Sequence, residues 1–221
     1  KATSLDNRTG GRVVSEQAIA LELERVDNQQ GEIQSLGNLM VNAVSGFIDN
    51  TLGLMRSGAT VTLHAASLVN RNTQAAEKGI EGLEINIVSQ QLDNTQGTVL
   101  SADTLNIANA GTLDNTQGEL SAAGEMSLSG AALRLINTRG VTLAGEKATI
   151  DVEGLTGDGR LLSLGEMTIN TRQAFDNLGD VIANGNLTFT TSGSVTNSGN
   201  LLAGEKLNFS AASLLNTTAA E

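Results

Sequence analysis

The chain has 221 residues with a formal net charge of −11; 39% of them are hydrophobic, but only 2% are aromatic. It contains no Cys, which excludes a disulfide framework and thiol chemistry. The acidic balance excludes the basic footprint that nucleic acids and anionic membranes require, and no apolar run approaches the roughly 20 residues that span a bilayer. We therefore expect no nucleic-acid partner and no insertion into a membrane.

The stretch Leu92–Ser101 returns almost unchanged at Leu113–Ser121, and looser copies run through the whole chain. Each copy can be indexed by one asparagine, and the spacing between index residues runs from 19 to 24 residues. A period of this size is typical of a solenoid. Gly157 holds the equivalent place in the one copy without Asn. The index asparagines are Asn7, Asn28, Asn50, Asn70, Asn94, Asn115, Asn137, Asn177, Asn197 and Asn216.

Three apolar columns recur at fixed distances from the index. The first lies two residues before it and comprises Leu5, Val26, Ile48, Leu68, Leu92, Leu113, Leu135, Leu155, Phe175, Val195 and Leu214. The second lies five residues after it and comprises Ile33, Met55, Val99, Leu120, Leu162, Ile182 and Leu202, with Arg12, Ala75 and Thr142 as exceptions. The third is a pair with a period of two, from Leu39/Val41 to Leu207/Phe209. In the last three repeats this pair comes one residue earlier, because the turn before it has lost one residue.

The alternation predicts about three short strands per repeat, separated by Gly, Asn, Ser and Asp turns. Such strands are too short to form a sheet within one repeat, so successive repeats must stack as coils about 4.8 Å apart. We therefore predict an all-β protein, a right-handed parallel β-helix of about ten coils and on the order of 50 Å in length. Residues 16–25 have some helical character, but Ile19, Leu21 and Leu23 alternate and favour a strand. The columns do not fit the spacing of leucine-rich repeats.

We expect residues 1–221 to form one β-helix with a single irregular coil. The repeat is weakest at residues 71–82, within the longest interval between index asparagines. We interpret this segment as a loop that bulges from the rod, before Leu83, Ile85 and Ile87 resume the strand. Loops on a rigid scaffold often carry function, so Arg71, Gln74, Glu77 and Lys78 are candidate contact residues. A tolerated insertion without a ligand is the favoured interpretation.

The repeats continue to the last residues, and no capping segment is recognisable at either end. We expect the native protein to extend beyond both termini and the isolated segment to associate end to end, because uncapped strands expose unpaired backbone groups.

The motif at residues 113–128, which begins Leu-Asp-Asn-Thr-Gln-Gly, resembles the haemagglutinin repeat of large two-partner-secreted bacterial exoproteins. These include filamentous haemagglutinin and the stick-like effectors of contact-dependent growth inhibition. The resemblance covers essentially the whole chain. It implies a β-helical filament, export through an outer-membrane transporter, and a location on the bacterial surface or outside the cell. The receptor on the target cell is not indicated.

The candidate sites favour a structural role. The index Asn tolerates a left-handed turn, and its amide can bond the equivalent amide one coil away. The preceding acids are expected to project outward, and adjacent pairs such as Asp27/Asp49 and Asp93/Asp114 could share a cation, although a solvated edge is favoured. These acids are Asp6, Asp27, Asp49, Asp93, Asp114 and Asp176.

No cofactor, metal site or catalytic residue is predicted. His64 is the only histidine, and an ordinary surface role is favoured for it. A polysaccharide-cleaving enzyme would need paired carboxylates, and the chain lacks the Trp and Tyr that would stack on sugar rings. We therefore favour a shaft that extends a distal binding or toxin module. The alternatives are a receptor-binding module, which uses the coil surface or the loop, and a polysaccharide-active enzyme.

Overall fold

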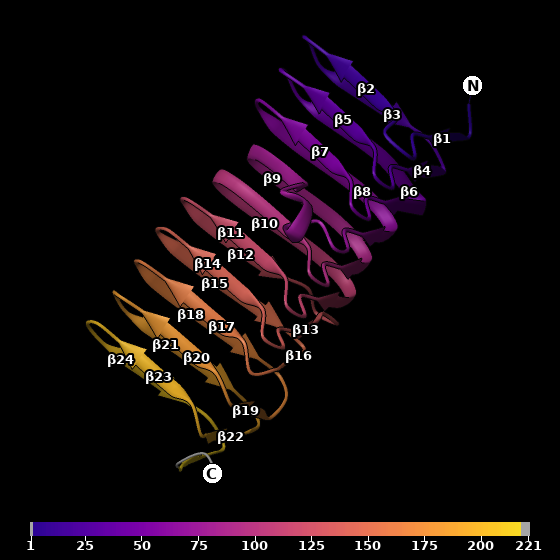
Figure 1. Ribbon diagram of the computed structural model, residues 1–221. Helices are drawn as coiled ribbons and strands as arrows, with labels where there is room; N and C mark the ends of the chain where they lie inside the picture. Colours follow the sequence, from indigo (N-terminus) through magenta and orange to yellow (C-terminus); the bar gives the residue numbers. More distant parts are fainter. Residues whose placement is uncertain (1, 218–221) are drawn as a thin grey trace.

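The computed structural model describes residues 2–217 and shows a β-solenoid of parallel strands stacked in about 11 coils (Figure 1). The prediction of a parallel β-helix is confirmed. Each coil has three strand positions, which we call A, B and C in the order in which the chain passes through them. Equivalent strands of neighbouring coils pair in parallel; for example, Leu39 pairs with Val61 and Leu105 pairs with Met126.

The strands are short because turns interrupt them two or three times per coil. Position A contains β2 (Arg12–Ser15), β5 (Glu32–Ser35), β7 (Leu54–Ser57), β11 (Glu119–Ala122), β14 (Val141–Ala144), β17 (Arg160–Ser163), β20 (Asp180–Ala183) and β23 (Asn200–Ala203). Position B contains β3 (Ile19–Glu22), β12 (Glu125–Ser129), β15 (Lys147–Val152), β18 (Glu166–Thr171), β21 (Leu187–Thr191) and β24 (Leu207–Ser210). Position C contains β1 (Ser4–Asp6), β4 (Arg25–Asp27), β13 (Arg134–Ile136), β16 (Gly154–Thr156), β19 (Phe175–Asn177), β22 (Ser194–Asn197) and β25 (Ser213–Asn216).

Four strands in the middle of the rod continue around a corner and occupy more than one position. They are β6 (Leu39–Asp49), β8 (Thr60–Val69), β9 (Gly79–Asp93) and β10 (Thr98–Asp114). The one helical element among the described residues is the short 3₁₀ helix η1 (Gln74–Ala76). The stretch at residues 16–25 forms β3 and the start of β4, as its alternation predicts.

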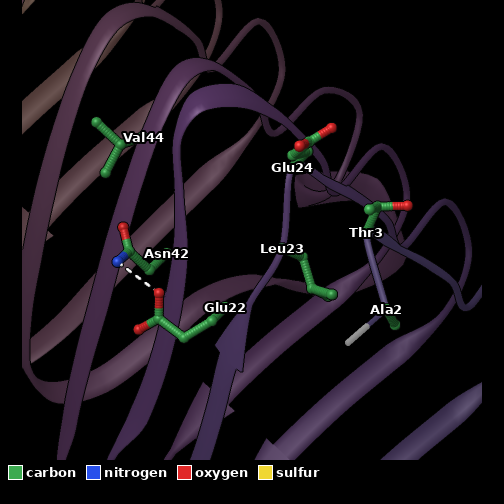
Figure 2. Close-up of a pocket in the computed structure, with 7 residues that line it drawn as sticks. All are labelled: Ala2, Thr3, Glu22, Leu23, Glu24, Asn42 and Val44. Atoms are coloured by element: carbon green, nitrogen blue, oxygen red, sulfur yellow. Dashed lines mark hydrogen bonds between the residues drawn. The ribbon is translucent and has the colours of Figure 1, made fainter.

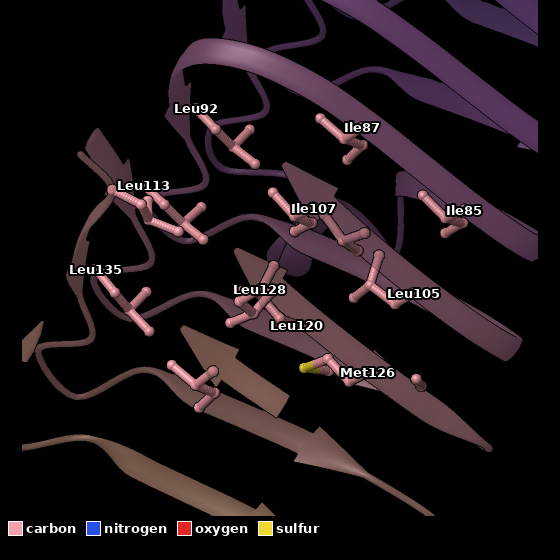
Figure 3. Close-up of a cluster of buried hydrophobic side chains, with 14 of the residues drawn as sticks. Ile85, Ile87, Leu92, Leu105, Ile107, Leu113, Leu120, Met126, Leu128 and Leu135 are labelled. Atoms are coloured by element: carbon pink, nitrogen blue, oxygen red, sulfur yellow. The ribbon is translucent and has the colours of Figure 1, made fainter. Parts of the chain in front are cut away.

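The core is the narrow interior of the rod, where side chains of equivalent strand positions lie above one another. Figure 3 shows Leu92, Leu113 and Leu135 in one such row, with Leu105 and Met126 in another. These five side chains are at most 2% exposed. Burial of one such side chain contributes roughly 1.5–3 kcal/mol relative to its exposure, so the rows are the main stabilising feature of the rod.

The second apolar column needs a correction in the last three repeats. Leu161, Val181 and Leu201 occupy the inward place, whereas Leu162 and Ile182 lie on the outer face of position A. The lost turn residue shifts the inward column to four residues after the index, as it shifts the paired column of position B.

The structure also explains the three exceptions in this column, Arg12, Ala75 and Thr142. Val13 and Ile80 fill the places that the spacing gave to Arg12 and Ala75, because those two turns have a different length. Thr142 is a true member and is 2% exposed, with Leu120 and Leu161 as its neighbours.

Candidate functional site

The index asparagines form a hydrogen-bonded stack that we call the asparagine ladder: Asn7, Asn28, Asn50, Asn70, Asn94, Asn115 and Asn137, and then Asn177, Asn197 and Asn216. In the first run each Nδ2 from Asn7 to Asn115 donates to the Oδ1 of the asparagine one coil further on, over 2.6–2.8 Å. Asn28, Asn50, Asn70, Asn94 and Asn115 are fully buried. The amide therefore bonds along the rod axis where no water can replace it.

Each ladder amide from Asn7 to Asn177 also bonds the backbone, which ties it to the fold. Asn70 Nδ2 donates to the Thr98 carbonyl at 2.9 Å, and Asn115 Nδ2 donates to the Val141 carbonyl at 3.1 Å. An amide provides two N–H donors and an acceptor on one short side chain, whereas Asp lacks the donors and Leu lacks both.

The turn after each ladder residue brings two coils into close contact. Gly97 N–H donates to the Asn94 carbonyl at 2.9 Å and closes a four-residue turn. A Cβ on Gly97 would clash with the Asn70 carbonyl oxygen of the previous coil, which explains the glycine. The residue before this glycine has a left-handed backbone, for example Gln96 with φ 52° and Gln117 with φ 55°.

The acids before the ladder residues alternate with inward-facing neighbours and so point to the outer face, but not all of them are solvated as expected. Asp27 and Asp49 are 4% and 9% exposed, whereas Asp6 and Asp176 are exposed. Asp27 and Asp49 are buried because neighbouring polar side chains cover them: Arg25 donates to Asp27 at 3.0 Å, and Gln29 donates to Asp49 at 2.8 Å.

Two of these carboxylates are held in the charged state by arginines. Hydrogen bonds from the Arg8 side chain and backbone lower the pKa of Asp6 to about 2. Burial by itself would raise the pKa of Asp93, but hydrogen bonds from Arg71 and Thr95 outweigh burial and lower it. Asp27 and Asp49 are paired in register, as are Asp93 and Asp114. Within residues 2–217, no group of three or more His, Cys, Asp or Glu residues is placed to hold a metal ion.

The irregular coil folds back onto the rod. Arg71 forms an ion pair with Asp93, and Lys78 Nζ lies 3.8 Å from Glu32 Oε1, on a coil two windings away. Leu54 lies in register between Glu32 and Gly79 and is only 5% exposed, although it points to the outer face. The Lys78 side chain therefore passes across Leu54.

Strand β9 begins at Gly79, so the last four residues assigned to the loop belong to a strand, and Leu83 is half exposed rather than in the core.

The candidate contact residues of this coil do not converge. Arg71 and Lys78 are engaged with acids of the rod, and Glu77 is an exposed left-handed residue after η1. Gln74 lines a surface groove of about 440 Å³, which the sequence did not reveal as a site. The groove is lined by Asn72, Gln74, Ala75, Gln96, Gln117 and Arg139.

The floor of this groove is a row of left-handed turn residues. The amides of Gln96 and Gln117 lie 2.8 Å apart, and the Gln117 oxygen fits best toward Arg139, 3.1 Å from both Nη atoms. The sequence signal for this row is the second residue after each index asparagine, which adopts a left-handed backbone in the turn. The groove therefore presents amides and one guanidinium to a polar partner.

A second hollow of about 310 Å³ lies at the first coils, and Figure 2 shows its lining. The Glu22 carboxylate accepts a hydrogen bond from Asn42 Nδ2 at 2.8 Å, and Leu23 separates it from Glu24. The two carboxylates thus do not face each other across the hollow as an acid and a base would. His64 lies further along the same outer row as Glu22 and Asn42 and is partly exposed.

The fold and these contacts define a β-solenoid repeat segment whose ordered polar groups serve mainly to bind one coil to the next. Residues 1–51 match the sequence profile of the haemagglutinin repeat family, and this match and the solenoid together fit a filamentous haemagglutinin-type repeat region. Comparisons with curated proteins and with solved structures found no match. Among the described residues, no helix is long and apolar enough to cross a membrane.

The family match bears on function at a coarse level. The haemagglutinin repeat is a structural repeat of adhesins that is not known as enzymatic, and it suggests a shaft-type segment of a filamentous adhesin. The family also implies a secreted exoprotein of the cell surface.

Proposed function

We propose that this chain is a shaft segment of a two-partner-secreted exoprotein, which holds a distal binding or toxin module away from the bacterial cell. The observation that supports the proposal most is the continuous parallel register at positions A and B, from β2 to β23 and from β3 to β24. A repeated coil adds length without new chemistry, which is what a spacer requires.

The parent protein is an adhesin or an effector of contact-dependent growth inhibition. Its export passes through an outer-membrane transporter that recognises a region outside this segment. The absence of cysteine from the sequence suits transport of an extended chain, since no cross-link can form before passage.

Removal of one whole coil from the parent protein tests the spacer role. Deletion of residues 115–136 joins Asp114 directly to Asn137. Because Asp114 pairs in register with Ile136, Asn137 then follows Asp114 just as Asn115 does in the native chain. The rod should shorten by about 4.8 Å while surface display and activity toward target cells persist. Deletion of residues 115–125 is the control, because it removes a turn and position A but leaves position B out of register. Loss of activity in a correctly folded whole-coil variant would contradict the spacer role.

A second candidate function is receptor contact, and the groove beside Gln74 supports it. Its donors are not fully engaged by the rod, unlike those of Arg71 and Lys78. The variant Q74A/R139A should then reduce binding to target cells at least tenfold, whereas T149A/T168A, on the outer face of position B, should not. Unchanged binding by both variants would eliminate the groove as the contact site.

We also propose that the isolated segment associates end to end, because its terminal coils present unpaired strand edges. Light scattering should show a mass that rises with concentration. A constant monomer mass at high concentration would contradict this association.

A further inference from the structure

The asparagine ladder is interrupted at one coil. Asn137 Nδ2 donates to the Arg160 carbonyl at 3.1 Å, but the next index residue is Gly157, which has no side chain to accept a second bond. On the other side, Asn177 Nδ2 donates to Asn197 Oδ1 at 2.6 Å. Among residues 2–217, no protein group donates to Asn177 Oδ1, although this atom is the acceptor of the coil-to-coil bond elsewhere in the ladder.

The interruption coincides with a break in the backbone ladder. Strand β16 does not pair with β19 within the described residues; β19, β22 and β25 form a separate three-stranded sheet. Positions A and B continue across the same two coils, through the pairs Arg160–Asp180 and Met167–Leu187. The two halves of the rod therefore remain joined, and only position C is open.

The turn at Gly157 leans toward the preceding coil and cannot carry a side chain. Its φ is +113°, and a Cβ there would come within 2.6 Å of the Asn137 carbonyl carbon and the Thr138 nitrogen. The space that remains is therefore on the side of Asn177. A substitution in place cannot fill it, so the gap is built into the shorter turn.

A small cavity lies in this gap, with about 10 Å³ open to a water-sized sphere. This volume is the minimum that holds one water. Its apolar walls are Leu155, Leu161, Phe175 and Val181, each at most 3% exposed. Its polar lining comprises Asn137, Thr156, Asn177 and the backbone of Gly157 and Gly159. Asn177 Oδ1 accepts no protein hydrogen bond and, unlike the Thr142 hydroxyl, is not sealed from a water-sized sphere, so a small ligand that donates a hydrogen bond can reach it.

We propose that the gap beside Gly157 is a binding site for one ordered water, which donates a hydrogen bond to Asn177 Oδ1. Water is the ligand that fits, because it is small enough and both donates and accepts. Its remaining bonds go to polar groups of the lining. The water takes the place of the missing asparagine at the head of the second ladder run and makes position C of this coil a hydrated step in the core.

The direct test is a crystal structure of the chain at a resolution that shows ordered water. We expect a water about 2.8 Å from Asn177 Oδ1 inside the cavity. A gap closed by protein atoms, or an Asn177 oxygen bonded to a protein donor, would overturn the proposal.

A turn replacement gives an independent test in solution. Residues 156–159 (Thr-Gly-Asp-Gly) are replaced by Ile-Asn-Thr-Arg-Gly, the sequence at residues 136–140. Oxygen-17 relaxation dispersion should show one long-lived water fewer than in the native chain. The control Q96R gives an intact turn the same Asn-Thr-Arg-Gly sequence and should leave the number unchanged. An unchanged number in a folded replacement variant would contradict the proposal, and if that variant does not fold, the crystal structure decides.

Discussion

The coils before and after Gly157 hold together in different ways. Before it, seven asparagines form an unbroken ladder, and the turns in its middle have four residues with a left-handed third residue. After it, the ladder has three asparagines and the turns are one residue shorter. The second region instead contains a stack of Phe175, Phe189 and Phe209, whose ring centroids lie 5.5 Å and 5.3 Å apart.

The comparison distinguishes the structural features that both regions share from those that only one region has. The apolar rows and the parallel register at positions A and B persist through both regions, so they define the fold. The ladder is a local reinforcement of position C, and aromatic stacking in the core accompanies its shortening. Aromatic pairs contribute about 0.5–1.5 kcal/mol beyond their buried area, which is of the order of one hydrogen bond.

The largest expected effect comes from the middle of the first ladder run. Asn94→Ala leaves the donor of Asn70 and the acceptor of Asn115 unpaired in a fully buried place and should cost roughly 3 kcal/mol in the free energy of unfolding. Asn197→Ala also leaves the donor of the buried Asn177 unpaired, but Asn216 is exposed and can bond water, so the cost should be smaller, about 1–2 kcal/mol. Urea denaturation measures both changes. Equal costs would remove the distinction between the two regions.

The aromatic stack is tested at its centre. Phe189→Leu removes both ring contacts from a side chain that is 1% exposed and should cost about 2 kcal/mol. Hydrogen exchange should accelerate in β21 and β24 more than in β6 and β8. Uniform acceleration along the rod would indicate that the two regions unfold as one unit.

A gain in stability is expected close to the boundary. The Thr142 hydroxyl is buried in the second apolar column without a hydrogen-bond partner among the described residues. Thr142→Val keeps the shape and removes this cost, so the free energy of unfolding should rise by about 1 kcal/mol. Thr149→Val, which points outward, is the control, and an equal gain there would assign the effect to strand propensity.

The smallest expected effect depends on pH. The pKa of Asp93 is lowered in the folded chain, so its contribution is present at pH 7 and is lost as pH falls through the folded value. Asp93→Asn should therefore cost below about 1 kcal/mol at pH 7, since Arg71 is half exposed, and the cost should shrink as the pH falls through the folded pKa of Asp93. Denaturation midpoints of both chains across this range measure the difference. A cost that does not change with pH would assign the effect to the Thr95 contacts rather than to charge.

The fold could be predicted because stacked coils need the same type of residue at equivalent places, so the pattern recurs at a nearly fixed interval in the sequence. The first apolar column, with Leu92, Leu113 and Leu135, is buried as its spacing predicts. The same spacing failed at Leu162 and Ile182, because a deletion within a turn moves the inward place by one residue. Fixed offsets hold only while the turn length is constant.

The features missed by sequence reasoning depend on contacts between coils that are not equivalent. Leu54 is buried on the outer face because Lys78 reaches across two windings, and no single repeat contains this information. Asp27 and Asp49 are covered by side chains whose direction the alternation does not specify. The groove beside Gln74 likewise forms only where η1 meets the turns of later coils.

Distances between spin labels test the stacked register most directly, since the chain has no native cysteine. The outer row of position B runs Thr62, Asn86, Asn106, Ser127, Thr149, Thr168 and Thr188 in successive coils. Cysteine labels at Thr62 paired with Thr149, Thr168 or Thr188 span four, five and six coils, so the mean distances should be about 19, 24 and 29 Å. Distances that do not increase by about 4.8 Å per coil would contradict the stacked rod, and the shaft function with it.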